Sequence, residues 1–322
     1  MTPQNTPRYR RAVVFAYHNV GLRCLQVLLA QGVEVLLVVT HQDDPRENRW
    51  FGSVAALCAE RGLPCIMPDK PDQALYEQVA ALAPDMIFSF YYRHMLAPEL
   101  LALAPGGAWN MHGSLLPKYR GRVPVNWAVL HGETETGMSL HAMHAKPDAG
   151  PLAGQVSVPI LPDDTAFEVF GKLTVAAEQL LWRELPYLCA GSPRLCDNPI
   201  AQGSYFGGRT PEMGRIDWRL PAQAVYNLHR AVAPPYPGAF CQLGPQRLIL
   251  QSARLLPPSQ AQHPELCQYL SCGLHVRANQ IYGVCGDGGA LLIHSLHDAQ
   301  GAAVSAAQLA AWLVHYPQGP VD

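Results

Sequence analysis

Residues 12–39, AVVFAYHNVGLRCLQVLLAQGVEVLLVV, hold two short apolar runs on either side of a stretch with helical spacing. Ala12 to Ala16 and Val33 to Val39 are apolar almost throughout, as is typical of strands buried on both faces. Between them we expect a helix from about Gly21 to Gln31. A strand–helix–strand unit of this kind predicts two parallel strands joined by a crossover helix.

The same alternation continues to residue 103. Further strands are expected at Cys65 to Met67 and Asp85 to Phe90, and further helices at Val54 to Arg61, Gln73 to Leu82 and Pro98 to Leu103. Continuous apolar strands, each followed by a helix, predict an α/β fold with a parallel sheet covered on both faces. Such sheets bind ligands at the carboxyl ends of their strands.

The pattern changes after Gly150. We expect one long helix over Ala166 to Leu188 and then a Gly- and Pro-rich connection over Gly191 to Met213. Beyond it, a helix near Gln223 to Val232 precedes short segments that we interpret as strands, at Ala239 to Gln242, Leu248 to Leu255, Ile281 to Val284 and Ala290 to Ser295. These segments predict a small, partly closed β-barrel. We therefore expect an α/β domain over residues 1–200 and a barrel domain over residues 201–322.

Composition excludes several classes of protein. The 322 residues have a formal charge of −2, whereas proteins that grip nucleic acid usually carry a basic surplus. Nine cysteines without C-x-x-C spacing favour reduced thiols over a zinc site or a disulfide framework. No signal peptide is evident, and no apolar run reaches the ~20 residues of a membrane span. We expect a cytoplasmic protein without nucleic-acid or membrane partners.

Functional side chains concentrate in residues 108–150, AWNMHGSLLPKYRGRVPVNWAVLHGETETGMSLHAMHAKPDAG. Asn110 and His112 follow a strand that we end near Trp109, and side chains at i and i+2 of an extended chain point to the same side. Asp148 arrives on a second loop, after an expected strand at Thr136 to Met143. A carboxylate beside an imidazole fixes its tautomer and raises its basicity.

These three groups suit acyl transfer to an amine. Such a reaction needs a donor for the tetrahedral oxyanion and a group that moves the proton of the amine. No Ser or Cys lies in a nucleophile-elbow context, which favours direct attack by the amine over an acyl-enzyme. On its own, however, an Asn-x-His pair at a strand end is usually structural.

Other motifs have plain structural interpretations. Three histidines, His131, His141 and His144, could suggest a metal, but they come from different elements, and we expect no metal site. The basic residues Lys118, Arg120 and Arg122 suit a solvated face as well as an anion site. The turn at residues 286–289 lacks the Lys-Ser/Thr of a phosphate loop, and residues 17–21 lack the glycines of a dinucleotide loop.

Taken together, the motifs make the chain resemble the 10-formyltetrahydrofolate-dependent formyltransferases. The matching stretches are VVFAYH (13–18), ERGLPCIMPD (60–69), FSFYYRHML (88–96), NMHGSLLPKYRGRVPVNWAVLHGETETG (110–137), PDAG (147–150), FGGRTPE (206–212) and RAVAPPYPGAF (230–240). Within this family the chain is most similar to the formyltransferase domain of a bifunctional enzyme. That enzyme formylates UDP-4-amino-4-deoxy-L-arabinose, a sugar used in lipid A modification and polymyxin resistance.

The resemblance implies a Rossmann-like domain followed by a barrel like the oligonucleotide-binding (OB) fold. It implies that Asn110 holds the formyl oxygen, that His112 transfers the proton, and that Asp148 raises the basicity of His112. The formyl donor would be 10-formyltetrahydrofolate, with no metal. The folate-contacting residues that it implies are His94, Met95, Leu96, Arg122, His144, Ala145, Lys146, Pro147 and Asp148.

The resemblance also defines the alternatives. The bifunctional enzyme continues into an NAD-dependent dehydrogenase domain, and this chain ends at Asp322, so we expect it to lack that activity. Methionyl-tRNA formyltransferase carries a Lys/Arg-rich insertion after its second strand, whereas residues 41–49 here hold three acids against two arginines. Another nucleotide-linked amino sugar, such as a 4-amino-4,6-dideoxyhexose, is an alternative that the sequence does not exclude. An idle folate-binding module is less favoured, because all three catalytic residues are present. A formyltetrahydrofolate hydrolase would also need the histidine and the aspartate, but the extended similarity to the sugar enzyme argues against it. The sugar, the order of binding and the oligomeric state, homo-oligomers included, stay open.

Overall fold

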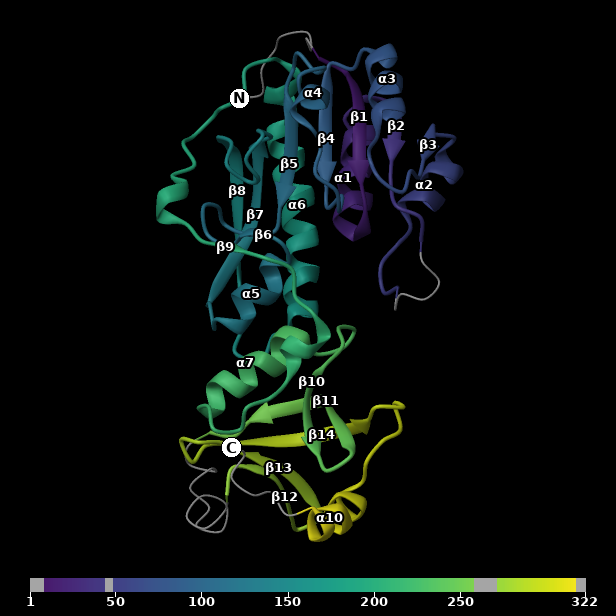
Figure 1. Cartoon of the computed structure of the whole chain (residues 1–322). Helices are drawn as coiled ribbons and strands as arrows, with labels where there is room; N and C mark the ends of the chain where they lie inside the picture. Colours follow the sequence, from purple (N-terminus) through teal and green to yellow (C-terminus); the bar gives the residue numbers. More distant parts are fainter. Residues whose placement is uncertain (1–8, 44–48, 258–270, 317–322) are drawn as a thin grey trace. The chain divides into compact units, whose positions relative to one another are not determined.

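The computed structural model describes residues 9–43, 49–257 and 271–316, and the chain divides into two compact units (Figure 1). The first unit contains Met1–Pro124, Glu135–Pro159 and Phe170–Gly207, and the second contains Val125–Thr134, Ile160–Val169 and Gly208–Asp322. Neither unit is therefore one continuous stretch of sequence. Among the described residues, no helix has both the length and the apolar character that a membrane span requires.

The first unit is built on a seven-stranded sheet of order β3-β2-β1-β4-β5-β7-β8. Its strands are β1 (Arg11–Ala16), β2 (Glu34–Val39), β3 (Cys65–Ile66), β4 (Met86–Phe90), β5 (Ala108–His112), β7 (Glu135–Ala142) and β8 (Leu152–Pro159). The predicted parallel sheet is confirmed for the first five strands, but β7 pairs antiparallel with both β5 and β8. Residues 143–151, between β7 and β8, are too few for a crossover helix, so these two strands form a hairpin.

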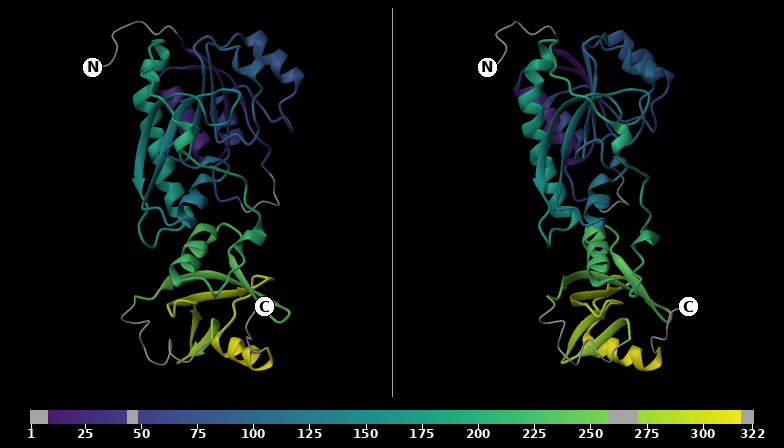
Figure 2. Two further views of the ribbon diagram at one scale, coloured as in Figure 1. Left: turned by 60° about the vertical axis from the view of Figure 1, so that its left-hand side comes forward. Right: turned by 90° about the vertical axis from the view of Figure 1, so that its left-hand side faces the viewer.

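Helices cover both faces of this sheet. They are α1 (His18–Ala30), α2 (Val54–Arg61), α3 (Gln73–Leu82), α4 (Pro98–Leu101) and α6 (Ala166–Cys189). Helix α5 (Pro124–Leu130) follows the loop after β5, and its residues from Val125 onward belong to the second unit. On one face Phe15 of β1 packs in a buried cluster with Val79 of α3 and Leu100 of α4. Figure 2 shows α6 on the opposite side of the sheet from α3. The continuous apolar strands of the sequence follow from this two-sided burial.

Helix α1 begins at His18, three residues before the predicted start at Gly21. Tyr17 is still extended, with φ −151°, and His18 itself has a left-handed φ of 64°. The helix therefore starts directly at the carboxyl end of β1, without an intervening loop. From the sequence, the polar pair His18-Asn19 was expected in a loop before the helix, whereas these residues form its first turn.

The second unit contains α7 (Ala222–Val232) and a five-stranded antiparallel sheet of order β10-β11-β14-β13-β12. The strands are β10 (Ala239–Leu243), β11 (Gln246–Leu255), β12 (Gly273–Arg277), β13 (Gln280–Val284) and β14 (Ala290–Asp298). The sheet is curled but open among the described residues, in agreement with the predicted partly closed barrel. Sequence patterns did not predict β12 or the final helix α10 (Ala306–His315), which Ser305 and Gln308 cap reciprocally.

A capping bond in the first unit gives a stability prediction. The Asp72 carboxylate accepts from the Leu75 N–H at 3.0 Å and caps α3, whereas the exposed Asp69 makes no such bond. We expect Asp72→Ala to lower the free energy of unfolding of this unit by about 1 kcal/mol, as loss of an N-cap usually does. Urea unfolding followed by circular dichroism would measure it. Asp69→Ala is the matched control, and equal losses in the two variants would contradict the role of the cap.

Candidate active site

Asn110 and His112 lie on β5, at the carboxyl-end edge of the parallel strands. The sequence ended this strand near Trp109, but both residues belong to it, because Ala108 to Met111 pair with β4 and Trp109 to His112 pair with β7. Their side chains point to the same side of the strand, as i and i+2 positions do. His112 is only 6% exposed, and Asn110 is half-buried.

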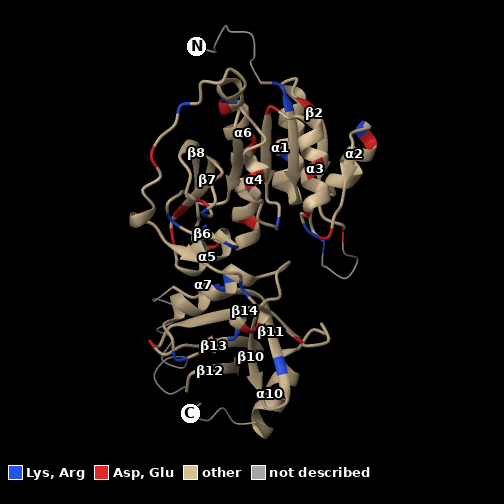
Figure 3. Ribbon diagram, turned by 45° about the horizontal axis from the view of Figure 1, so that its top comes forward, with Lys and Arg blue, Asp and Glu red and all other residues tan. Residues whose placement is uncertain are grey.

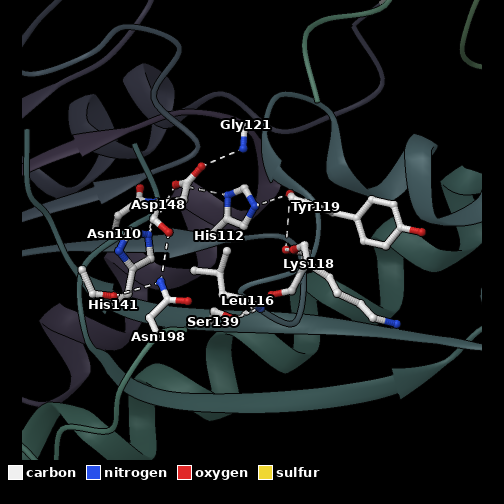
Figure 4. Close-up of polar contacts among 12 residues, drawn as sticks. Asn110, His112, Leu116, Lys118, Tyr119, Gly121, Ser139, His141, Asp148 and Asn198 are labelled. Carbon is white, nitrogen blue, oxygen red and sulfur yellow. Dashed lines mark hydrogen bonds and ion pairs between the residues drawn. The ribbon is translucent and has the colours of Figure 1, made fainter. Parts of the chain in front are cut away.

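The hydrogen bond of His112 identifies its basic nitrogen. Nε2 lies 2.9 Å from the carbonyl oxygen of Tyr119, and a carbonyl only accepts, so Nε2 carries a proton. In the neutral ring Nδ1 is then the unprotonated nitrogen. It lies 3.5 Å from Oδ1 of Asp148 (Figure 4). A proton accepted at Nδ1 would therefore create an imidazolium directly beside a carboxylate.

Asp148 is held in place by backbone and amide groups from distant segments. Its Oδ2 accepts from the Gly121 N–H at 2.8 Å, and its own backbone has a left-handed φ of 49°. The Asn198 amide donates to the carbonyls of Asp148 at 3.0 Å and Gly150 at 3.1 Å. A Cβ at Gly150 would overlap the carbonyl of Ala142, so only glycine lets this loop close against β7.

A second histidine orients the amide of Asn110. Asn110 and His141 are direct cross-strand partners in β5 and β7, and Asn110 Nδ2 lies 3.0 Å from His141 Nε2. His141 Nδ1 donates to the carbonyl of Ala142 at 2.8 Å, which leaves Nε2 as an acceptor. One amide hydrogen of Asn110 is thus used by His141, and the other is free to donate to a ligand (Figure 4).

The loop that follows β5 is fixed by a buried hydroxyl network. Ser139 Oγ donates to the carbonyl of Ser114 at 2.6 Å and accepts from the Leu116 N–H at 3.1 Å. The Gln155 amide donates to Ser139 Oγ at 2.8 Å and to the carbonyl of Leu116 at 3.0 Å. Strands β7 and β8 therefore hold the loop whose Tyr119 carbonyl and Gly121 N–H position His112 and Asp148.

The protonation states suit a base and its counter-ion. Burial lowers the pKa of His112 below its usual value, and His141 acts in the same direction, while Asp148 and the Tyr119 carbonyl oppose them. Burial alone would raise the pKa of Asp148, but the contacts of the carboxylate, among them the hydrogen bond that it accepts from the Gly121 N–H, hold that pKa well below its usual range. At neutral pH His112 is consequently neutral and able to accept a proton, and Asp148 is ionised.

The residues implied as folate contacts lie in three loops. His94 and Met95 are exposed after β4, while the side chain of Leu96 is buried in the core cluster, so that residue could meet a ligand only through its backbone. Arg122 and the segment His144, Ala145 and Lys146 are exposed, and Pro147 is half-buried before Asp148. Within the described ranges the side chains of Arg122, His144 and Lys146 have no hydrogen bond or ion pair.

The structure separates residues that the sequence grouped. Lys118 and Arg122 are exposed, whereas Arg120 is 9% exposed, with its guanidinium 5.9 Å from the Tyr205 ring centroid, so the basic trio is not one solvated face. No three His, Cys, Asp or Glu side chains in the described part of the chain are placed to bind a metal together. His131, His141 and His144 are therefore not placed to bind one metal ion together.

Sequence reasoning missed His141 as an orienting residue and Asn198 as the anchor of the Asp148 loop. His141 was noted only as a metal candidate, because its pairing with Asn110 depends on the register of two strands. Asn198 lies in the Gly- and Pro-rich connection, which also contributes β9 (Tyr205–Phe206) beside β6 (Arg120–Gly121). No pattern in the sequence indicates either contact.

The geometry predicts the titration of His112. Asp148→Asn removes a negative charge 3.5 Å from Nδ1, so the pKa of His112, already lowered by burial, should fall further. Proton-detected NMR of the imidazole across pH would measure the change. Asp197→Asn, at an exposed carboxylate next to Asn198, is the control and should leave the titration unaltered. An unchanged pKa in Asp148→Asn would show that the two groups are not electrostatically coupled.

Family models match both parts of the chain. The model described as "Formyl transferase" covers residues 16–185, and the model described as "Formyl transferase, C-terminal domain" covers residues 209–312. The first match alone spans more than half of the chain and includes Asn110, His112 and Asp148.

Solved structures share the fold at low identity. An N-formyltransferase from Helicobacter canadensis, in complex with folinic acid and dTDP-3-aminofucose, is 16% identical with a TM-score of 0.69, covering 88% of this chain and 98% of its own. WlaRD, a sugar 3N-formyltransferase solved with dTDP and 5-N-formyl-THF, is 16% identical with a TM-score of 0.68, covering 88% and 96%. HypX from Aquifex aeolicus, in complex with tetrahydrofolic acid, is 16% identical with a TM-score of 0.62, covering 98% and 50%. From the two family matches, the chain belongs to the formyl transferase family.

Proposed function

We propose that the chain transfers the formyl group of 10-formyltetrahydrofolate to the amino group of a nucleotide-linked amino sugar, and that this sugar is UDP-4-amino-4-deoxy-L-arabinose. The observation that carries the proposal is the convergence of Asn110, His112 and Asp148 on one edge of the sheet. An oriented amide donor, a neutral base and an ionised carboxylate are the groups that formyl transfer to an amine requires.

As a member of its family the chain is a formyltetrahydrofolate-dependent N-formyltransferase. Exposed cations near the site suit this donor, because the glutamate tail of a folate is anionic. The side chains of Arg122 and Lys146 have no hydrogen bond or ion pair among the described residues and could each form charge-assisted hydrogen bonds. We infer that they contact the donor together with the backbone around His94 to Leu96 and His144 to Asp148.

The geometry assigns one role to each residue. Asn110 donates its free amide hydrogen to the formyl oxygen as the amine attacks the formyl carbon and negative charge develops there. His112 accepts the proton of the amine at Nδ1, and Asp148 stabilises the resulting imidazolium. His112 then returns that proton to N10 as the bond between N10 and the formyl carbon breaks. The products are the formamide and tetrahydrofolate, and His112 is neutral again.

Charge supports a small acceptor over a tRNA. Lys and Arg lie among Asp and Glu in the view of Figure 3, and the formal net charge is −2. In the loop after β2, Arg49 is paired with Asp43 at 2.5 Å, so its charge is balanced by an acid of the same loop, while residues 44–48 of that loop lie outside the described residues. Nucleic-acid affinity depends largely on such contacts.

A dTDP-linked amino sugar is the second candidate. Two of the solved structures with this fold are sugar N-formyltransferases, with dTDP or dTDP-3-aminofucose bound. The family resemblance of the sequence favours the UDP-linked sugar, while these structures favour dTDP. A cytoplasmic location stays a prediction, and the oligomeric state stays open.

A substrate panel tests the function. Purified protein and 10-formyltetrahydrofolate would be incubated with UDP-4-amino-4-deoxy-L-arabinose, dTDP-linked amino sugars and methionyl-tRNA, and products would be detected by mass. We expect a gain of one formyl group on a nucleotide sugar, fastest for the UDP-linked arabinose derivative. Methionyl-tRNA should not react at a comparable rate, and if it did, the proposed substrate class would be wrong.

Variants of the site test the mechanism. We expect Asn110→Ala to lower kcat by about 10²–10³-fold and His112→Ala by about 10²–10⁴-fold, with circular dichroism unchanged. His141→Phe should also lower kcat, because the Asn110 amide loses its acceptor, and His141→Gln should restore part of the loss. In Asp148→Asn the ascending limb of the pH–rate profile should move to lower pH, since the pKa of His112 falls. A His112→Ala enzyme with most of its kcat would contradict the assigned roles.

A further inference from the structure

Five rings meet at the carboxyl ends of β1 and β4: His18, Trp50, Phe51, Tyr91 and Phe170, here called the aromatic cluster. In the strand order β3-β2-β1-β4-β5 the chain runs outward in opposite directions from β1 and β4. Such a topological switch point is where open α/β sheets bind ligands. No role in the formyl-transfer chemistry has been assigned above to any of these rings.

His18 is at the centre of the cluster. Its ring stacks on Phe51 at a centroid distance of 3.9 Å and meets Trp50 and Phe170 edge-on, each at 4.6 Å. Two residues of the cluster have left-handed backbones, His18 with φ 64° and Tyr91 with φ 59°. Non-glycine residues in this region are uncommon and gather at ligand sites.

The protonation of His18 follows from its surroundings. Burial, and to a lesser extent the Arg93 guanidinium, lower the pKa of His18 to about 3, so the ring is neutral at physiological pH. Its Nδ1 is buried without a hydrogen-bond partner in the described part of the chain, although the residue as a whole is partly exposed. A buried N–H without an acceptor is rarer than a buried lone pair, so the proton is on Nε2. The ring then offers an uncharged Nε2–H donor toward its exposed edge.

The cluster adjoins the catalytic strand. Phe90 of β4 pairs with Met111 of β5, so Tyr91 is level with His112, and neighbouring strands lie about 4.8 Å apart. A Cβ at Gly113, directly after His112, would overlap the Tyr91 hydroxyl. The aromatic cluster and His112 are thus next to each other at the same sheet edge.

We propose that the aromatic cluster is the subsite for the sugar ring of the acceptor, with His18 Nε2–H donating to a sugar hydroxyl. This inference rests on the proposed function and deepens it. A pyranose presents an apolar C–H face together with hydroxyl groups, and the cluster offers the partly exposed rings of Trp50, Phe51 and Tyr91 together with one fixed uncharged donor. Seated here, the sugar brings its amine to the strand end that carries His112.

Packing alone would not require the polar atom. A phenyl ring fills nearly the same space as an imidazole and leaves no buried nitrogen unsatisfied. A purely structural cluster would therefore be more stable with a phenyl ring at this position. The imidazole at this position is explained if its other nitrogen binds a ligand. His18→Phe therefore separates the two explanations, because it keeps the ring and removes the donor.

The test compares acceptor and donor affinities. We expect His18→Phe to raise the KM for the nucleotide amino sugar roughly three- to tenfold, the value of one neutral hydrogen bond. The Kd for 5-formyltetrahydrofolate, measured by calorimetry, should stay unchanged. His18→Gln places an amide N–H near the position of Nε2 and should raise the KM less. His229→Phe is the matched control, since His229 of α7 is also buried with an unpartnered Nδ1 among the described residues.

The outcomes separate this inference from the function on which it rests. If wild-type protein formylates no nucleotide amino sugar, the proposed function fails and the sugar subsite with it. If wild-type protein is active and His18→Phe keeps its acceptor KM, the function stands and the subsite is wrong. A rise in donor Kd equal to the rise in acceptor KM would assign the aromatic cluster to the folate and overturn the proposal as well.

Discussion

The carboxylate of Asp148 has to stay ionised at 12% exposure, and the surrounding chain is arranged to make that state stable. An isolated buried carboxylate would take up a proton instead. Here the hydrogen bond from the Gly121 N–H favours the charged form, and Asn198 holds the loop that presents it. The charge of Asp148 in turn determines whether His112 can accept a proton and hold it.

This requirement connects segments that are far apart in the sequence. Residues 110–121, 139–155 and 198–206 each supply a part: the imidazole and its backbone partners, the hydroxyl and amide network, and the anchor of the Asp148 loop. The hairpin of β7 and β8 supports two of these parts at once. The antiparallel edge of the sheet therefore contributes as much to the site as the parallel strands do.

Sequence patterns were sufficient to predict the elements whose apolar residues directly reflect their burial. The apolar runs of β1, β2 and β4 predicted the sheet, and i and i+2 spacing predicted that Asn110 and His112 share a side. Strand β8 was missed because LAGQVSVP combines a glycine with an alternating, half-exposed pattern next to a Gly- and Pro-rich segment. His141 and Asn198 could not be predicted, because their partners are set by strand register and by a long connection. The triad itself was found chiefly because its motif belongs to a recognisable family.

The cross-strand pairing of Asn110 with His141 has a further consequence. Side chains alternate along a strand, so a shift of one residue between β5 and β7 would place Leu140 or Ala142 opposite Asn110 and turn His141 to the other face. Single-residue insertions or deletions inside these two strands should therefore abolish activity, because they separate His141 from Asn110. The turn after α5, around residues 131–134, lies outside both strands and can change length while the pairing is kept. The enzyme should therefore tolerate insertions at that turn but not within either strand.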